Sequence, residues 1–292
     1  MSGVLALGFS ALFVRWAAAP GPVTGLYRMA LATIVLTPLA LRRPPAAHRS
    51  WPRMGVLLAL LGGLSLSFDL ALWNTAVGLT SAANATLFAN TAPLWVALVA
   101  WVALGERLRP LFWGGLALTL LGAAAVAGAD FQSQTGFGVG DLLAICASFF
   151  YAGYYLLTQL GRRYLHSAPY VWIAGLASST SLLAMTLLLG LPLTGYPPAT
   201  YLWFAALALV TQAFGYLAVG YALGHLPASV VSPSMVGQPV VTALLAIPLL
   251  GEPLSTTQIL GGGAVLIGIL LVHRSRLTPK LPEPEIAPQS AD

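Results

Sequence analysis

The amino-acid sequence predicts an all-α membrane protein with ten transmembrane helices, arranged as two inverted five-helix repeats. The first observation is composition. Hydrophobic residues make up 58% of the chain and charged residues 7%, whereas a soluble domain carries about 25% charged residues. The second is a series of apolar runs, each of the ~18 or more residues that can cross the hydrocarbon of a bilayer as a helix. The third is an internal repeat with an offset of 146 residues.

The apolar runs account for almost the whole chain and leave no room for a separate soluble domain. We expect helices at residues 3–20, 23–41, 54–73, 80–104, 111–128, 139–160, 170–190, 200–223, 227–250 and 256–273. The first repeat is predicted at residues 1–130 and the second at 131–273. The Pro-rich, charged segment 274–292 is expected to form a disordered cytoplasmic tail.

The first apolar run also resembles a signal peptide, because Ala17-Ala18-Ala19 is similar to a cleavage site. A signal peptide has a basic region before its apolar stretch, and this run has none. Arg15 also interrupts the end of the run. Cleavage would remove the counterpart of the sixth helix. We therefore expect residues 3–20 to form the first transmembrane helix.

Basic residues are concentrated in alternate connections. Of the thirteen Lys and Arg residues, all but Arg15 and Arg28 lie between the second and third, fourth and fifth, and sixth and seventh helices, or after the tenth. The positive-inside rule makes this side cytoplasmic. Both termini are then cytoplasmic, and the expected location is a bacterial inner membrane. Because the basic residues are scattered over short loops, the charge of +5 is a topology signal and indicates no nucleic-acid partner.

The internal repeat preserves residues that interrupt or terminate helices. Fifteen of fifty-one positions are identical when residues 76–126 are aligned with 222–272. The aligned residues are Gly78, Pro93, Gly105, Glu106, Gly115 and Gly122, with Gly224, Pro239, Gly251, Glu252, Gly261 and Gly268. Five helices per half is an odd number, so the second half enters the membrane from the opposite side. Inverted repeats of this kind are typical of secondary transporters.

Several short motifs occur in order along the predicted helices. They are Ser81-Ala82-Ala83-Asn84-Ala85, Pro93-Leu94, Leu104-Gly105-Glu106-Arg107, Gly140-Asp141-Leu142-Leu143-Ala144 and Leu250-Gly251-Glu252-Pro253. Together they resemble the EamA signature of the drug/metabolite transporter superfamily, over nearly the whole chain. The resemblance implies a carrier that exports small metabolites or amino acids, with a cavity lined mainly by the third, fourth, eighth and ninth helices. Relatives in that superfamily exchange nucleotide sugars or sugar phosphates.

The residues give little support to ATP binding, metal or cofactor chemistry, or proteolysis. The single lysine, Lys280, lies in the tail, so the chain has no P-loop and no site for ATP. Cys146 is the only cysteine, and no cofactor or metal is expected. Gly138-Val139-Gly140-Asp141 matches the GxGD string of intramembrane aspartyl proteases, a mechanism that needs a second aspartate at the same depth. Only Asp69 is available for that role, and it lacks the sequence context, so we expect no enzyme.

Three ionisable residues lie inside the predicted membrane segments, where a charge is costly. They are Arg15, Arg28 and Asp69, and residue counting places all three within about 8 Å of the external interface. We expect Asp69 to form a gating cluster with one or both arginines. Alternatively, each arginine reaches the headgroups separately.

Neutral polar residues mark the candidate substrate site. Asn90 and Gln238 lie beside the mid-helix prolines Pro93 and Pro239, which free backbone carbonyls near the midplane and are expected to act in gating. The further candidates for substrate binding are Thr86, Asn84, Ser232, Gln212, Tyr216, Trp73 and Tyr151. Ordinary hydrogen bonding between helices is the alternative role of each.

These residues favour a secondary transporter that exports amino acids by uniport or exchange. The predicted midplane has no carboxylate, and Asp69 is expected to lie too near the outside for strong ion coupling. Amides, hydroxyls and aromatic rings suit a small zwitterion or an apolar amino acid. They suit a nucleotide sugar or sugar phosphate poorly, since no arginine is expected near the midplane. A non-saturating channel and a lipid-intermediate flippase stay open as alternatives. The expected partners are the bilayer and a small-molecule substrate.

Overall fold

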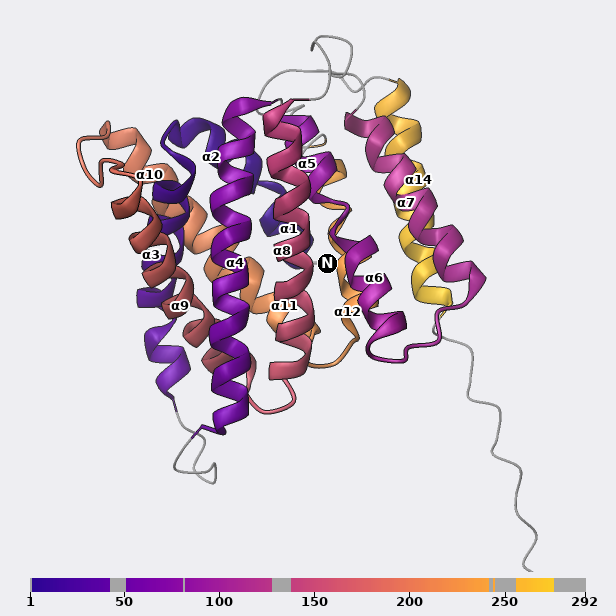
Figure 1. The fold of residues 1–292 in the computed structure, drawn as a ribbon. Coiled ribbons are helices and arrows are strands. Elements are labelled where there is room, and N and C mark those ends of the chain that lie inside the picture. Colours follow the sequence, from indigo (N-terminus) through magenta and orange to yellow (C-terminus); the bar gives the residue numbers. More distant parts are fainter. Residues whose placement is uncertain are drawn as a thin grey trace, which may run out of the picture.

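The computed structural model describes residues 2–42, 51–80, 82–127, 138–241, 244 and 256–275. Within these ranges every regular element is a helix and no strand occurs. The helices stand side by side in one bundle (Figure 1). Most of the predicted tail, the Glu252 motif and the side chain of Asn84 lie outside the description.

Six of the predicted spans are single helices, and four are divided or partly described. The single helices are α3 (Gly21–Leu41), α4 (Arg53–Leu79), α7 (Pro110–Ala127), α8 (Val139–Gly161), α9 (Ser167–Leu188) and α14 (Thr256–Arg274). The other elements are α1 (Ser2–Gly8), α2 (Ser10–Ala17), α5 (Ala82–Ala89), α6 (Ala92–Val102), α10 (Pro198–Ala206), η2 (Leu207–Tyr216), α11 (Leu217–Ala222) and α12 (Ala228–Met235). Seven helical segments among the described residues are long and apolar enough to cross a membrane, and two shorter apolar helices accompany them. This agrees with the predicted all-helical membrane protein.

The third predicted helix is longer than its apolar run indicates. We expected it to end at residue 73, but α4 continues to Leu79. Asn74 and Thr75 mark the end of the apolar run, yet each donates a hydrogen bond inside the bundle. The Asn74 amide nitrogen donates to the Gly21 carbonyl oxygen at 3.1 Å, and the Thr75 hydroxyl donates to the Ala71 carbonyl oxygen at 2.7 Å. The helix therefore continues through polar residues whose side-chain donors are bonded inside the bundle.

The fourth predicted helix is broken near its middle. We expected one helix kinked at Pro93, but α5 ends at Ala89 and α6 begins at Ala92. Pro93 lies in the first turn of α6, where a missing N–H costs no intrahelical hydrogen bond. The break leaves Asn90 and Thr91 between two half-helices. The eighth span is also irregular, because η2 is a π-helix, a form that is frequent at functional sites.

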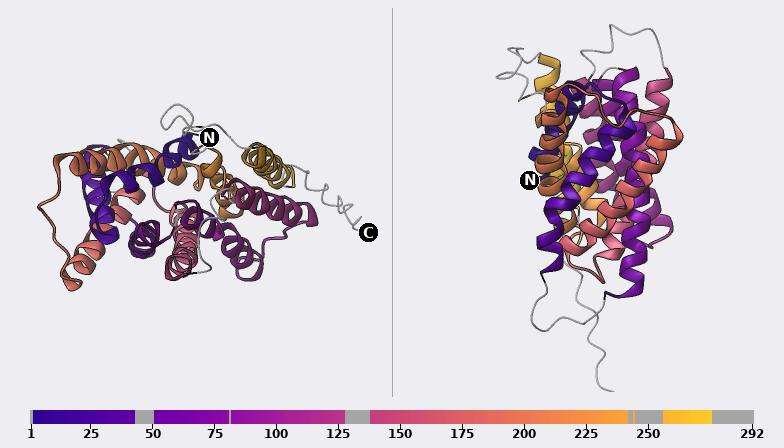
Figure 2. Two further views of the ribbon diagram at one scale, coloured as in Figure 1. Left: turned by 90° about the horizontal axis from the view of Figure 1, so that it is seen from above. Right: turned by 90° about the vertical axis from the view of Figure 1, so that its left-hand side faces the viewer.

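Small residues allow α7 and α14 to pack closely. A Cβ atom on Gly122 would lie 2.7 Å from the Gly261 carbonyl oxygen, and one on Gly115 would lie 2.9 Å from the Gly268 carbonyl oxygen. The internal repeat relates these two contacts to each other. At an offset of 146 residues Gly115 aligns with Gly261 and Gly122 aligns with Gly268, so the Gly122–Gly261 contact corresponds to the Gly268–Gly115 contact. The absence of a side chain at these four glycines therefore allows the close approach of the two helices. The two helices lie together at one side of the bundle in Figures 1 and 2.

The connection from α8 to α9, which carries Arg162 and Arg163, packs against other segments at one end of the bundle. Gly55, near the start of α4, packs against Tyr164 and Leu165 in the connection from α8 to α9. Gly224, which precedes α12, packs against the Arg162 guanidinium of the same connection. The start of α4 and the segment before α12 are therefore both neighbours of this connection.

Candidate functional site

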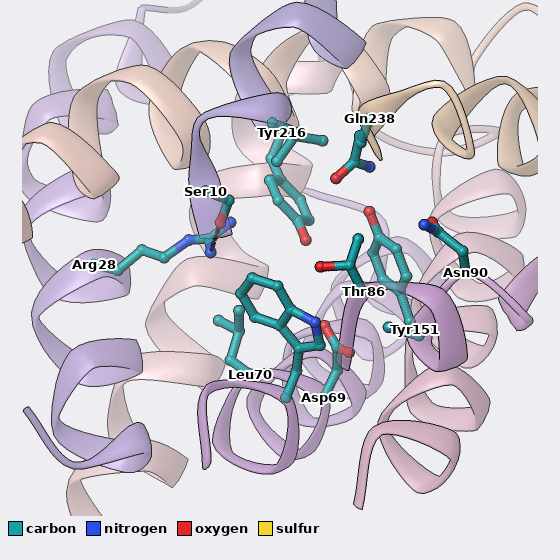
Figure 3. A pocket seen from close by; sticks show the side chains of 12 residues that line it. Ser10, Arg28, Asp69, Leu70, Thr86, Asn90, Tyr151, Tyr216 and Gln238 are labelled. Carbon is teal, nitrogen blue, oxygen red and sulfur yellow. Dashed lines mark hydrogen bonds between the residues drawn. The ribbon is translucent and has the colours of Figure 1, made fainter. Parts of the chain in front are cut away.

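A cavity lies in the centre of the bundle between residues of both halves (Figure 3). Its lining consists of Leu7, Ser10, Arg28, Asp69, Leu70, Trp73, Thr86, Ala89, Asn90, Tyr151, Tyr216 and Gln238. Its free volume is about 50 Å³. Since one water molecule needs roughly 10–15 Å³ of such space, this conformation has room for a few waters. A larger ligand would require the lining to move apart.

The cavity brings together eight of the side chains that the sequence singles out. They are Arg28, Asp69, Trp73, Thr86, Asn90, Tyr151, Tyr216 and Gln238. Gln212 lies behind the lining, where it accepts a hydrogen bond from Arg28. Ser232 is buried, and Pro93, Pro239 and Ser232 are not part of the lining. Sequence reasoning missed Ser10, whose only signal is a small polar residue in an apolar run.

Asn90 reaches the cavity because the fourth span breaks beside it. The residue lies between α5 and α6, and its side chain is 8% exposed. Its amide nitrogen is buried without a hydrogen-bond partner among the described residues. A buried donor of this kind costs about 1–3 kcal/mol if it stays unpaired, so Asn90 offers an unused hydrogen bond at the cavity.

Asp69 lies farther from the end of its helix than the sequence predicts. We expected it within about 8 Å of the external interface, because the third helix was expected to end at residue 73. In the structure α4 runs from Arg53 to Leu79, which places Asp69 about 24 Å from one end of the helix and about 15 Å from the other. The carboxylate is therefore close to the middle of α4.

Arg28 is held at the cavity by neutral groups. Its Nε donates to the Gln212 side-chain oxygen at 3.0 Å, and its Nη1 donates to the Ser10 hydroxyl at 3.0 Å. The guanidinium carbon also lies 5.5 Å from the centre of the Tyr216 ring, within the range of a cation–π interaction. Arg28 is only 2% exposed, so these contacts fix its orientation without neutralising its charge.

The expected pairing of Asp69 with the two arginines is not formed in this conformation. Arg15 lies in the last turn of α2, and its side chain is exposed. Neither arginine makes an ion pair with Asp69 within the described part of the chain, and Arg28 bonds Ser10 and Gln212 instead. Asp69 and Arg28 nevertheless face the same cavity (Figure 3).

Tyrosines from α8 and η2 form one wall of the cavity. The Tyr155 hydroxyl donates to the Tyr151 hydroxyl at 2.8 Å. The Tyr216 ring centre lies 5.5 Å from that of Tyr154 and 6.5 Å from that of Tyr151. This wall combines large apolar surfaces with hydroxyl groups that donate or accept hydrogen bonds.

The halves also meet at the end of the bundle that carries the basic connections. There the Ser229 hydroxyl donates to the Glu106 carboxylate at 2.6 Å. Ser229 lies in the first turn of α12, where the helix dipole favours a negative charge. Glu106 follows α6, so this contact joins the first half of the chain to the second. In the described ranges, no three His, Cys, Asp or Glu side chains are grouped as metal ligands would be.

Comparisons with known proteins agree with this architecture. The model of the EamA-like transporter family matches residues 1–128 and 138–274. A probable terminal-alkyne amino-acid exporter of Streptantibioticus cattleyicolor is 29% identical over 259 residues, which cover 86% of this chain and 84% of that protein. An uncharacterized transporter of Methanothermobacter thermautotrophicus is 27% identical over 272 residues, covering 86% and 78%. The fold is similar to a crystal structure with 19% sequence identity, at a TM-score of 0.76 over 94% of this chain and 96% of that one.

Proposed function

The chain belongs to the EamA-like transporter family, and on this premise we propose that it is an alternating-access carrier that exports amino acids by uniport or exchange. The observation that carries the proposal is the central cavity. Asp69 and Asn90 reach it from the first half of the chain, and Tyr151 and Gln238 reach it from the second. Secondary carriers bind substrate between their two repeats, often where helices are broken. The relative named as an amino-acid exporter supports the substrate class.

The proposed architecture is a pair of inverted five-helix repeats, residues 1–130 and 131–273, with both termini in the cytoplasm of a bacterial cell. The symmetric glycine contacts between α7 and α14 support the pseudo-twofold relation. Single cysteines introduced at positions 134 and 280, in a Cys146→Ser background, test the orientation. An impermeant thiol reagent is expected to label position 134 only from outside and position 280 only from inside. Labelling of both from the same side would contradict the inverted repeat.

Transport is tested with the purified protein in liposomes and labelled amino acids. A carrier gives saturable uptake. It also gives accelerated counterflow, because unlabelled substrate that binds inside the liposome carries the site back to the outside, where it is released and labelled substrate binds. Flux that rises linearly with concentration and shows no counterflow would contradict the carrier and favour a channel. Movement of a lipid-linked substrate in place of amino acids would favour a flippase.

A nucleotide sugar or sugar phosphate fits this cavity less well. Its lining includes one cationic side chain, Arg28, and one anionic side chain, Asp69. A phosphate group carries up to two negative charges, and proteins commonly bind it with clusters of arginine or lysine. The carboxylate of Asp69 would repel it. A small molecule with little net charge is therefore the better match.

A further inference from the structure

The central cavity is lined by two ionisable side chains of opposite sign that form no ion pair with each other. Asp69 is 6% exposed and Arg28 is 2% exposed, and both line the same space. Within the described ranges no ion pair joins them, since the Arg28 donors reach Ser10 and Gln212. The two charges are thus separated across a cavity that is otherwise lined by neutral groups (Figure 3).

The carboxylate of Asp69 has no protein partner among the described residues. It makes no hydrogen bond there, although its neighbours on α4 do: Ser67 bonds Ser181, and Asn74 bonds Gly21. An ionised carboxylate in a water-poor site is costly unless an opposite charge or several donors compensate it. Because no described residue supplies either, a cationic group that enters the cavity would compensate it.

The guanidinium of Arg28 is oriented but still charged. Ser10, Gln212 and the Tyr216 ring fix it from neutral positions. Arginine has five N–H donors in a planar fork, of which Nε and Nη1 make these two bonds. A fork of this shape matches a carboxylate, with which it forms short, charge-assisted hydrogen bonds. The unpaired amide nitrogen of Asn90 adds a neutral donor to the same cavity.

We infer that the cavity binds the free zwitterion of an α-amino acid, with the ammonium group on Asp69 and the carboxylate on Arg28. The inference rests on the proposed function and adds that both charged groups of the substrate are required. Leu7, Leu70 and Trp73 supply apolar surface in the same lining and face the substrate side chain. The bound state is more open than the present one, whose free volume is about 50 Å³.

The first experiment uses the wild-type protein in liposomes with labelled leucine as the probe. Three unlabelled competitors share the 3-methylbutyl chain of leucine: leucine itself, its decarboxylated analogue isoamylamine, and its deaminated analogue 4-methylpentanoate. Each analogue lacks one of the two charges. The inference predicts that each competes about 10-fold or more weakly than leucine, as expected for the loss of a charge-assisted hydrogen bond. Competition by either analogue as strong as that of leucine would overturn it.

Substitutions then assign each charge to its residue. In Asp69→Asn, leucine and the amine are expected to lose at least ~10-fold in affinity, while the acid analogue is unchanged. In Arg28→Gln, leucine and the acid analogue are expected to weaken, while the amine is unchanged. Ser67→Ala, on the same helix but outside the cavity, serves as the control. Folded variants that keep the wild-type order of the three competitors would overturn the assignment.

The outcomes also separate this inference from the proposed function. If either variant fails to fold, the analogue series on the wild-type protein still decides the inference. Counterflow of leucine that both single-charge analogues inhibit as strongly as unlabelled leucine does would leave the amino-acid carrier standing and refute the zwitterion site. The absence of counterflow with every amino acid would refute the proposed function itself.

Discussion

The contact between α7 and α14 gives a stability prediction with built-in controls. A Cβ atom at Gly122 would lie 2.7 Å from the Gly261 carbonyl oxygen and 2.7 Å from the Val265 backbone nitrogen. Ordinary contacts begin at about 3.4 Å, so Gly122→Ala requires the two backbones to separate by about 0.7 Å. Overpacking of this kind costs about 1–3 kcal/mol, whereas replacing a helical glycine by alanine would otherwise gain up to ~1 kcal/mol.

Gly114→Ala is the matched control, because it lies on the same helix and an added Cβ meets nothing within 4 Å. The two substitutions change helix propensity equally, so the difference between them isolates the contact. We expect Gly122→Ala to be less stable than Gly114→Ala by about 1–3 kcal/mol. The assay is the midpoint temperature of unfolding of the detergent-purified proteins, followed by loss of the monodisperse species. A midpoint for Gly122→Ala equal to or above that of Gly114→Ala would refute the close packing of α7 and α14.

Three further predictions concern the cavity, the contact between the halves and one backbone position. Asn90→Leu and Gln238→Leu are each expected to weaken substrate affinity in liposome uptake; normal uptake by both, at normal amounts of folded protein, would exclude them from the site. Glu106→Gln removes the charge that accepts the Ser229 hydrogen bond between the two halves of the chain. It is expected to change the rate of counterflow more than the substrate affinity, and an unchanged rate would show that this contact does not affect transport. Gly105 has a φ of 67° and open space around its Cβ position, so Gly105→Ala is expected to cost about 1–2 kcal/mol of backbone strain; thermal unfolding at the wild-type midpoint would contradict this.

The sequence predicts where helices form better than where they end. Hydropathy locates the apolar runs because each must remove ~20 residues from water. It fails at the end of α4, because Asn74 and Thr75 look like interface residues but bond inside the bundle. For the same reason Asp69 lies farther from the end of its helix than expected. Pro93 predicts an irregularity, but whether the helix kinks or breaks depends on the packing of α6, which no local pattern contains.

The sequence predicted many of the residues that line the cavity but not how they are arranged. Intramembrane polar residues are costly, so Asn90, Gln238 and Asp69 stand out in a chain with so few of them. Asp69 and Arg28 were expected to pair because residue counting placed them at a similar depth. The sequence gives no distance between their helices, so it could not show that the two groups stay apart. The structure separates them because Ser10 and Gln212 hold the guanidinium. Ser10 itself was missed, since a lone serine in an apolar run is usually a structural residue.

Accessibility of the cavity from each side of the membrane is the most direct test of alternating access. Thr86 lines the cavity and is partly buried, so Thr86→Cys in a Cys146→Ser background places a single thiol there. Ser178→Cys is the control, since Ser178 is buried on α9 and bonds the Gly63 carbonyl oxygen away from the cavity. We predict that an impermeant thiol reagent labels position 86 from either side, that saturating leucine slows both reactions, and that position 178 stays unlabelled. Labelling of position 86 from one side only under all conditions, or from neither side, would contradict the account.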